Sequence, residues 1–184
     1  VVKTKIERFR ETQRSTKLDG LTGLFNHTAA KSRLKVMASR LTPGSQLTVA
    51  MLDIDHFKSI NDTYGHPVGD QVIRGLAWLL KGRLRATDLI GRYGGEEFLL
   101  ALPDVSAAQA YAVIDRIRQD FAKLPHPNQN GALYATFSAG VAAYPLYDTP
   151  QELTEAADNA LLSAKRSGRN RVEMADAESC RAQF

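Results

Sequence analysis

The chain has 184 residues, 43% of them hydrophobic, which is enough for one globular domain with a substantial core. Its 24 Lys and Arg residues nearly balance 20 Asp and Glu residues and are scattered along the chain, so we expect no nucleic-acid partner. No apolar run approaches the roughly 18 residues that span a bilayer, and the N-terminus shows no secretory signal. Because Cys180 is the single cysteine, we expect no internal disulfide and predict a cytoplasmic location, with membrane tethering through regions outside this sequence left open.

The first seventeen residues are almost all charged or polar, and Val2, Ile6 and Phe9 lie three or four apart. This thin apolar stripe predicts a helix, the end of a longer one, which the Asp19-Gly20 pair then terminates. The predicted division is a stalk helix over residues 1–17, a main domain over 18–176 and a loose tail over 177–184.

The main domain shows an alternation of helical and strand patterns. In chain order they predict a helix over 25–40, a strand over Leu47–Ile54, helices over Phe57–Tyr64 and Val68–Leu84, strands over Leu89–Tyr93 and Phe98–Leu102, a helix over Ser106–Leu124, a strand over Leu133–Tyr144, a helix over Pro150–Arg166 and a strand over Val172–Met174. This order predicts an α+β fold, an α/β sandwich in which a mostly antiparallel central sheet of split βαβ type is surrounded by helices.

Acidic residues occur at the ends of two predicted strands. Asp53 and Asp55 close the first strand, and Glu96 and Glu97 follow the Gly-Gly turn of the hairpin. If the first strand pairs beside the hairpin, these carboxylates meet at one sheet edge and repel one another unless a cation intervenes. Oxygen ligands of this kind suit Mg²⁺, which binds one or two carboxylates together with substrate phosphates. The alternative is an ordinary hairpin turn with solvated glutamates.

The turn itself, Gly94-Gly95-Glu96-Glu97-Phe98, resembles the signature of the GGDEF-domain diguanylate cyclases in its GGEEF form. Further motifs resemble that family in the same order: Asp19, Leu21-Thr22-Gly23-Leu24 and Asn26; Leu52-Asp53-Ile54-Asp55-His56-Phe57-Lys58; Asn61-Asp62, Gly65-His66 and Gly69-Asp70; and Ala164-Lys165 with Gly168-Arg169-Asn170. The resemblance runs from about residue 19 to residue 172. It implies the palm-like fold of nucleotidyl cyclases and the condensation of two GTP molecules into cyclic di-GMP and two pyrophosphates.

The resemblance also implies a metal and catalytic set. Asp53, Glu96 and the carbonyl of Ile54 would hold Mg²⁺, with Mn²⁺ as a substitute. Glu96 would also act as the base for the 3′-hydroxyl, Glu97 would support it, and Lys58 would contact a phosphate or remain solvated. Asp55 has no implied role, and we interpret it as a surface acid at the strand end.

For the substrate, the resemblance implies that Asn61 and Asp70 read guanine, whose polar edge matches an amide and a carboxylate. Gly94 and Gly95 would let the nucleotide approach the backbone. The implied phosphate-binding pair is Lys165 and Arg169, one helical turn apart if the helix persists. The alternatives are helix caps for Asn61 and Asp70, and cations that offset a helix dipole for Lys165 and Arg169.

A second site is implied by Arg85-Ala86-Thr87-Asp88, which ends five residues before the signature. In the family such an RxxD set binds the product and inhibits the enzyme, with Arg116 as a further contact here. The alternative is a pair of ordinary charges near a helix end. Two positions depart from the family pattern, His27 in place of Arg and Leu162 in place of Tyr, and both are interpreted as structural.

The implied partners follow from the product. Cyclic di-GMP is two-fold symmetric, so we expect a homodimer that supplies one half-site from each subunit. A sensory domain is expected before the stalk. The alternative functions are a catalytically silent receptor for cyclic di-GMP and a GTP-sensing module.

Overall fold

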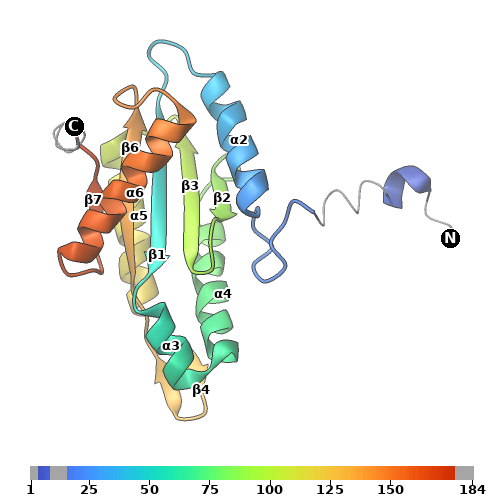
Figure 1. The fold of residues 1–184 in the computed structure, drawn as a ribbon, viewed down its shortest axis with the longest axis vertical. Coiled ribbons are helices and arrows are strands. Elements are labelled where there is room, and N and C mark those ends of the chain that lie inside the picture. The colour runs from blue at the N-terminus through green and yellow to red at the C-terminus, as the bar shows by residue number, and fades with distance from the viewer. Residues whose placement is uncertain (1–3, 9–15, 177–184) are drawn as a thin grey trace.

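The computed structural model describes residues 4–8 and 16–176 (Figure 1). Residues 5–8 are helical, whereas the remainder of the predicted stalk up to residue 15 and the tail from 177 lie outside the described residues. The elements of the main domain are α2 (His27–Ser39), β1 (Leu47–Ile54), α3 (Phe57–Tyr64), α4 (His66–Arg83), β2 (Leu89–Arg92), β3 (Glu97–Pro103), α5 (Ala107–Ala122), β4 (His126–Asn128), β5 (Gly131–Leu133), β6 (Phe137–Tyr144), α6 (Pro150–Arg166) and β7 (Val172–Met174). Within the described ranges, no helix is long and apolar enough to cross a membrane.

The central sheet has the strand order β2-β3-β1-β6-β7. Strand β1 is antiparallel to both of its neighbours, β3 and β6, and only β7 runs parallel to the strand beside it. The predicted α+β class with a mostly antiparallel sheet is therefore confirmed.

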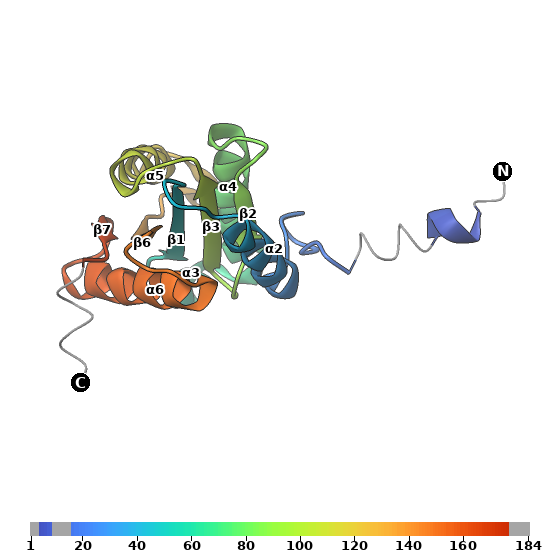
Figure 2. The ribbon, with the colours of Figure 1, turned by 90° about the horizontal axis from the view of Figure 1, so that it is seen from above.

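Helices cover both faces of this sheet, with α4 and α5 on one side and α2 and α6 on the other (Figure 2). Successive residues of β1 alternate between the two layers: Leu52 and Ile54 pack with α4 and α5, whereas Val49 and Met51 pack with α2 and α6. Because both faces are covered, β1 is buried along its whole length, which explains its continuous apolar sequence. The same alternation turns Asp53 toward α6.

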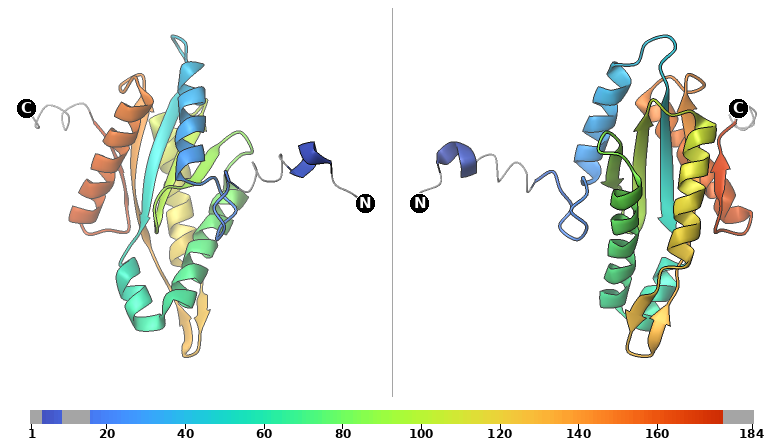
Figure 3. Two further views of the ribbon diagram at one scale, coloured as in Figure 1. Left: turned by 45° about the vertical axis from the view of Figure 1, so that its right-hand side comes forward. Right: turned by 180° about the vertical axis from the view of Figure 1, so that it is seen from behind.

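Two predicted boundaries were wrong. The predicted strand over Leu133–Tyr144 is divided, because β4 and β5 form a separate hairpin ahead of β6 that extends past the end of the sheet near α3 and α4 (Figure 3). Its turn is closed by the Asn130 N–H, which donates to Asn128 Oδ1 at 2.9 Å. Helix α4 begins at His66 rather than Val68, because Pro67 is accommodated in the first helical turn, where its missing N–H is not needed.

Candidate active site

The register of the sheet brings the acidic residues of β1 and β3 together. Asp53 is the direct antiparallel partner of Glu97, and the Ile54 N–H donates to the Glu96 carbonyl at 3.2 Å. Glu97 lies in the same alternating series as Leu99 and therefore projects toward the same layer as Asp53. Asp53 therefore meets the glutamates at one sheet edge as expected, whereas Asp55 is hydrogen-bonded to Thr136, Ser138 and Asn170 instead.

Asp53 is buried in this acidic edge, with 6% of its surface exposed. Lys165 Nζ on α6 donates to Asp53 Oδ2 at 2.8 Å. Burial raises the pKa of Asp53 to about 6, with the charges of Glu96 and Glu97 adding to the rise and the Lys165 ion pair opposing it. Burial, with the charges of Asp158 and Glu96, also raises the pKa of Glu97. The edge therefore carries more negative charge than its own lysine neutralises.

The Gly-Gly turn is fixed by Arg92. Its Nε and Nη2 both donate to the Gly95 carbonyl, at 3.0 and 2.8 Å, and its Nη1 donates to Asp19 Oδ1 at 3.0 Å. A Cβ on Gly94 would come within 2.8 Å of Glu97 Oε2, whereas a Cβ on Gly95 would meet nothing within 4 Å. Gly94 thus makes room for Glu97, and the surface over Gly95 is open to a ligand.

The opening motif supports the same turn, a role that the sequence pattern alone does not indicate. Asp19 accepts from the N–H and hydroxyl of Thr22 at 2.8 and 2.7 Å, and these bonds with the Arg92 charge outweigh burial and lower the pKa of Asp19. His27 Nδ1 lies 2.8 Å from the Tyr93 carbonyl, and the two rings stack with centroids 4.2 Å apart. The unusual His27 is thus a structural contact of the turn, whereas Leu162 is exposed on α6.

The donor set at this edge fits a magnesium ion. Among the described residues, no group of three or more His, Cys, Asp or Glu side chains is arranged to hold a metal by itself. Two carboxylates and a carbonyl, completed by phosphate oxygens, are however the ligands that Mg²⁺ ordinarily takes. Asp53, Glu96 and the Ile54 carbonyl, the ligands that the sequence predicts, are of this chemical type, and the ammonium of Lys165 lies beside Asp53.

Helices α3 and α4 bring Asn61 and Asp70 into one region. Asn61 Oδ1 is buried without a hydrogen-bond partner, and it lies 1.9 Å from where a Cβ on Gly69 would be. A side chain at position 69 would displace the Asn61 amide, and the residue after Gly69 is Asp70. Neither residue is a helix cap, because Asn61 lies inside α3 and Asp70 lies in the second turn of α4. A buried acceptor that lacks a donor is a group that a ligand can satisfy.

The N-terminus of α3 follows directly after the acidic edge. His56 precedes the helix with φ of 54°, and no side chain caps the first turn. Uncapped N–H groups at a helix N-terminus favour phosphate oxygens. Lys58, in this first turn, is exposed.

The predicted phosphate-binding pair, Lys165 and Arg169, lies on either side of the end of α6. Helix α6 ends at Arg166, so Lys165 and Arg169 are not one helical turn apart. Lys165 lies on Asp53, and Arg169 lies in the following loop with φ of 64°. The helix ends because Gly168 and the two residues after it adopt positive φ angles.

Asp55 was wrongly interpreted as a surface acid. It is 4% exposed and accepts from Ser138 Oγ and Thr136 Oγ1, each at 2.7 Å, and from the Asn170 N–H at 3.0 Å. Ser138 and Thr136 are visible in the sequence as hydroxyl residues near the start of a strand, but their contact with Asp55 depends on the fold.

The RxxD residues lie at the other end of β3, away from Glu96. Arg85 donates to Asp88 from both its backbone N–H, at 2.7 Å, and its guanidinium, at 3.1 Å. The same guanidinium donates to the carbonyl of Pro103, the last residue of β3, at 2.6 Å. Arg116 is exposed on α5, which packs beside α4.

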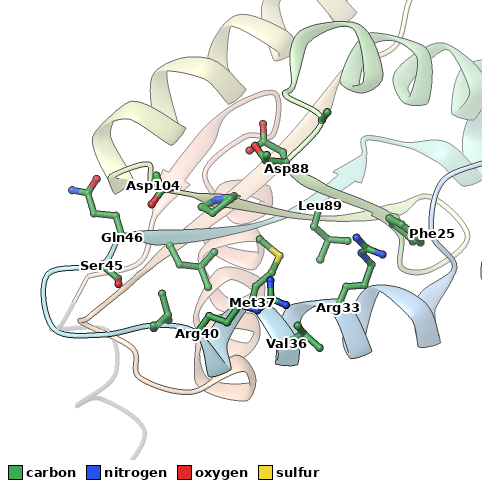
Figure 4. Close-up of a pocket in the computed structure, with 15 residues that line it drawn as sticks. Phe25, Arg33, Val36, Met37, Arg40, Ser45, Gln46, Asp88, Leu89 and Asp104 are labelled. Atoms are coloured by element: carbon green, nitrogen blue, oxygen red, sulfur yellow. The ribbon is translucent and has the colours of Figure 1, made fainter.

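A groove of about 720 Å³ lies between α2 and β2 (Figure 4). Asp88 lines it together with Arg33 and Arg40, and the sequence did not indicate this groove.

The layered sheet and its acidic edge define a palm-like α+β domain. Within that class the chain belongs to the GGDEF domain family: the family model described as "Diguanylate cyclase, GGDEF domain" matches residues 16–171.

Named relatives are similar over most of the chain. Diguanylate cyclase DgcP of Pseudomonas aeruginosa is 43% identical over 167 residues, which is 90% of this chain and 25% of that protein. Response regulator PleD of Caulobacter vibrioides is 42% identical over 93% of this chain and 41% of its own length. The chain therefore spans less than half of these relatives. The solved coiled coil and GGDEF domain of DgcB from Caulobacter crescentus, in complex with c-di-GMP, has a TM-score of 0.86 and 34% identity, covering 93% of this chain and 94% of that one.

Proposed function

We propose that this domain is a diguanylate cyclase, which condenses two GTP molecules into cyclic di-GMP and releases two pyrophosphates. The observation that carries the proposal is the register of β1 against β3, which sets Asp53 opposite Glu97 and bonds Ile54 to Glu96. Named cyclases that are 37–43% identical to the chain support the same activity.

Asp53, Glu96 and the Ile54 carbonyl would hold a divalent cation, Mg²⁺ with Mn²⁺ as a substitute. When bound, such an ion neutralises the charge that develops on the phosphate and helps to activate the attacking hydroxyl. It would also replace the lysine charge beside Asp53, which leaves Lys165 free to bind a phosphate oxygen. The raised pKa of Asp53 is then a property of the protein before the cation binds.

The remaining groups orient the substrate. The N–H groups at the start of α3, with Lys58, Lys165 and Arg169, would bind the triphosphate. Asn61 and Asp70 would read the guanine edge, because the orphaned Asn61 Oδ1 can accept from a guanine donor. Gly95 leaves space for the ribose, and Glu96 would take the proton of the 3′-hydroxyl, with Glu97 in support. Catalysis would then be mainly positioning and electrostatic stabilisation.

The product has two-fold symmetry, so we propose that two copies of the domain meet with their acidic edges facing each other. Each copy would supply one GTP and one Glu96. A sensory domain attached through the segment before residue 18 would control that encounter, as the partial coverage of the relatives suggests. We also propose that the domain is located in the cytoplasm.

We further propose that Arg85, Asp88 and Arg116 bind cyclic di-GMP and inhibit the enzyme. Asp88 is already satisfied by Arg85, so the product would replace the Arg85–Asp88 bonds with its own. Arg85→Ala should therefore leave the initial rate unchanged and abolish the slowing of the reaction as product accumulates. A progress curve that still slows to the same extent would contradict this site.

One assay tests the main proposal. The protein is incubated with Mg²⁺ and either GTP or ATP, and products are separated by chromatography. Cyclic di-GMP from GTP alone is the expected result. Cyclic di-GMP binding without turnover would instead identify a silent receptor, and GTP binding without turnover would identify a GTP-sensing module.

A further inference from the structure

The loop between α6 and β7 has an unusual backbone. Gly168, Arg169 and Asn170 adopt φ angles of 115°, 64° and 47° in succession. Positive φ is disfavoured for residues with a side chain, and two such residues in a row are rare. A conformation of this kind persists only where its surroundings hold it in place.

Hydrogen bonds to Asn170 hold this loop from two directions. From the sheet side, its N–H donates to Asp55 Oδ2 at 3.0 Å and lies 3.1 Å from Ser138 Oγ. From the helix side, Arg118 Nη1 on α5 donates to Asn170 Oδ1 at 2.7 Å and to its carbonyl at 3.2 Å. Both polar ends of Asn170 are thereby fixed.

The two anchors are themselves fixed. Asp55 Oδ1 accepts from Ser138, and Oδ2 accepts from Thr136 as well as from Asn170, so both oxygens are engaged by the protein itself. Arg118 Nε donates to Asp115 Oδ1 at 2.7 Å, and the guanidinium is largely buried, with 17% of the side chain exposed. The chain of contacts runs from Asp115 on α5 to the end of β1.

The residue that this arrangement orients is Arg169, which directly precedes Asn170 and whose side chain is exposed. Its N–H donates to the Ala164 carbonyl of α6 at 3.0 Å, one residue before the lysine that lies on Asp53. The loop thus links the anchored Asn170 to the acidic edge.

We propose that Asp55 and Arg118 are positioning residues: through Asn170 they hold the left-handed loop that presents Arg169 to the triphosphate. This inference rests on the proposed function, because it takes Arg169 as a phosphate ligand. Neither Asp55 nor Arg118 touches the substrate. Loss of either anchor should loosen Arg169 and weaken the binding of GTP equally in the ground state and the transition state, which raises KM and leaves kcat unchanged.

The test is a double-mutant cycle between Arg118 and Arg169. Arg118→Met keeps the length of the side chain and removes the donation to Asn170. It should raise the GTP KM and the dissociation constant of a non-hydrolysable GTP analogue by about tenfold, with kcat within about twofold. In an Arg169→Ala background the same substitution should have no further effect, since the residue through which it acts is gone. The affinity for guanosine, which has no phosphate, should be unchanged in all variants.

Arg83→Met is the matched control, because it removes another Arg–Asp pair, the 2.8 Å contact with Asp120, from the neighbouring helix. It should change neither constant. Should Arg118→Met fail to fold, as seen by circular dichroism, Asp55→Asn is carried through the same cycle.

Additive effects of the two substitutions, or an unchanged analogue affinity in Arg118→Met, would overturn the positioning role. Turnover by the wild type reports separately on the proposed function. A wild type that binds the analogue without turnover would refute the cyclase proposal while the cycle still decides the positioning role. A wild type that binds no GTP would refute both.

Discussion

Two aspartates at the end of β1, Asp53 and Asp55, differ in how completely their carboxylates are hydrogen-bonded and charge-balanced by the protein. Asp53, the pairing partner of Glu97 on β3, has one lysine partner from α6, two like charges nearby and a pKa raised to about 6. Toward β6, Asp55 lies only two residues further along, yet it accepts three hydrogen bonds from fixed donors. Both aspartates are almost fully buried, so burial alone does not distinguish them.

The end of β1 therefore has a binding edge, which contains Asp53, Glu96 and Glu97, and an anchoring edge, which contains Asp55. Charge that the protein leaves uncompensated is available to a cation and a triphosphate, and it destabilises the fold until they bind. Charge that is fully hydrogen-bonded fixes the loop beside it and is unavailable to a ligand. The predictions below alter one side of this contrast at a time.

The largest effect is expected for Glu96→Gln, which keeps the size of the side chain and removes its charge from the binding edge. Cyclic di-GMP formation should fall by about 1,000-fold or more, since a cation ligand and a base are lost together. The variant should be at least as resistant to thermal unfolding as the wild type, because a like charge beside Asp53 is removed. Asp104→Asn, a matched change of an exposed acid just after the other end of β3, should leave the rate unaltered. An active Glu96→Gln protein would contradict the assignment of the edge.

Asp53→Asn should abolish turnover and yet stabilise the protein in the absence of nucleotide. The folded pKa of Asp53 lies above its ordinary value, so its contribution to stability is fully present below about pH 4 and is lost as the pH rises through about 6. At pH 7.5 the free energy of unfolding of the asparagine variant, measured by urea titration, should therefore exceed that of the wild type by about 1 kcal/mol. This difference should vanish near pH 4. A destabilised variant at pH 7.5 would show that Asp53 is as well satisfied as Asp55.

Gly69→Ala tests the guanine side of the site. The added Cβ would overlap Asn61 Oδ1 and displace it, so the GTP KM should rise by about tenfold while metal affinity stays the same. Gly82→Ala is the control in the same helix, because a Cβ there meets nothing within 4 Å. Equal kinetics for the two variants would argue against Asn61 as a base-reading residue.

The smallest effect concerns His126, an unsatisfied group away from the binding edge. Its Nε2 is buried without a partner, and burial lowers the pKa of the imidazole. The stability that the neutral ring contributes is present above the ordinary histidine pKa and is lost as the pH falls below it. His126→Phe should therefore reduce the loss of stability between pH 7.5 and pH 5 and leave turnover unaltered. A loss of turnover would show that this group also serves the reaction.

The sequence predicted the fold well where elements are long and strongly patterned. Strand β1 is buried on both faces and reads as a continuous apolar run, so both of its bounds agree with the prediction. The predicted starts of α5 and α6 agree with the structure to within one residue, and capping boxes at Ser106 and Thr149 stabilise these helix starts. The β4–β5 hairpin was missed because its strands have three residues each, too few to show a period of two.

The candidate site was predictable to the extent that it depends on strand ends. The strand pattern placed Asp53 and Glu97 at strand ends and made their meeting conditional on the pairing of β1 with β3, which the structure supplies. The sequence could not show which hydrogen-bond partners each carboxylate has. Asp55 resembles Asp53 in the sequence, and only the tertiary contacts of Asp55 with Thr136, Ser138 and Asn170 distinguish the two. The end of α6 at Arg166 was predicted correctly, whereas the positive φ angles of Arg169 and Asn170 beyond it were not visible in the sequence.

The most direct test of the account is a Mn²⁺ titration followed by electron paramagnetic resonance, in the presence of a non-hydrolysable GTP analogue. If Asp53 and Glu96 ligate one cation, Asp53→Asn and Glu96→Gln should each weaken Mn²⁺ binding by about tenfold or more, since each removes a charged ligand. Full Mn²⁺ affinity in either variant would contradict the shared site and, with it, the proposed chemistry.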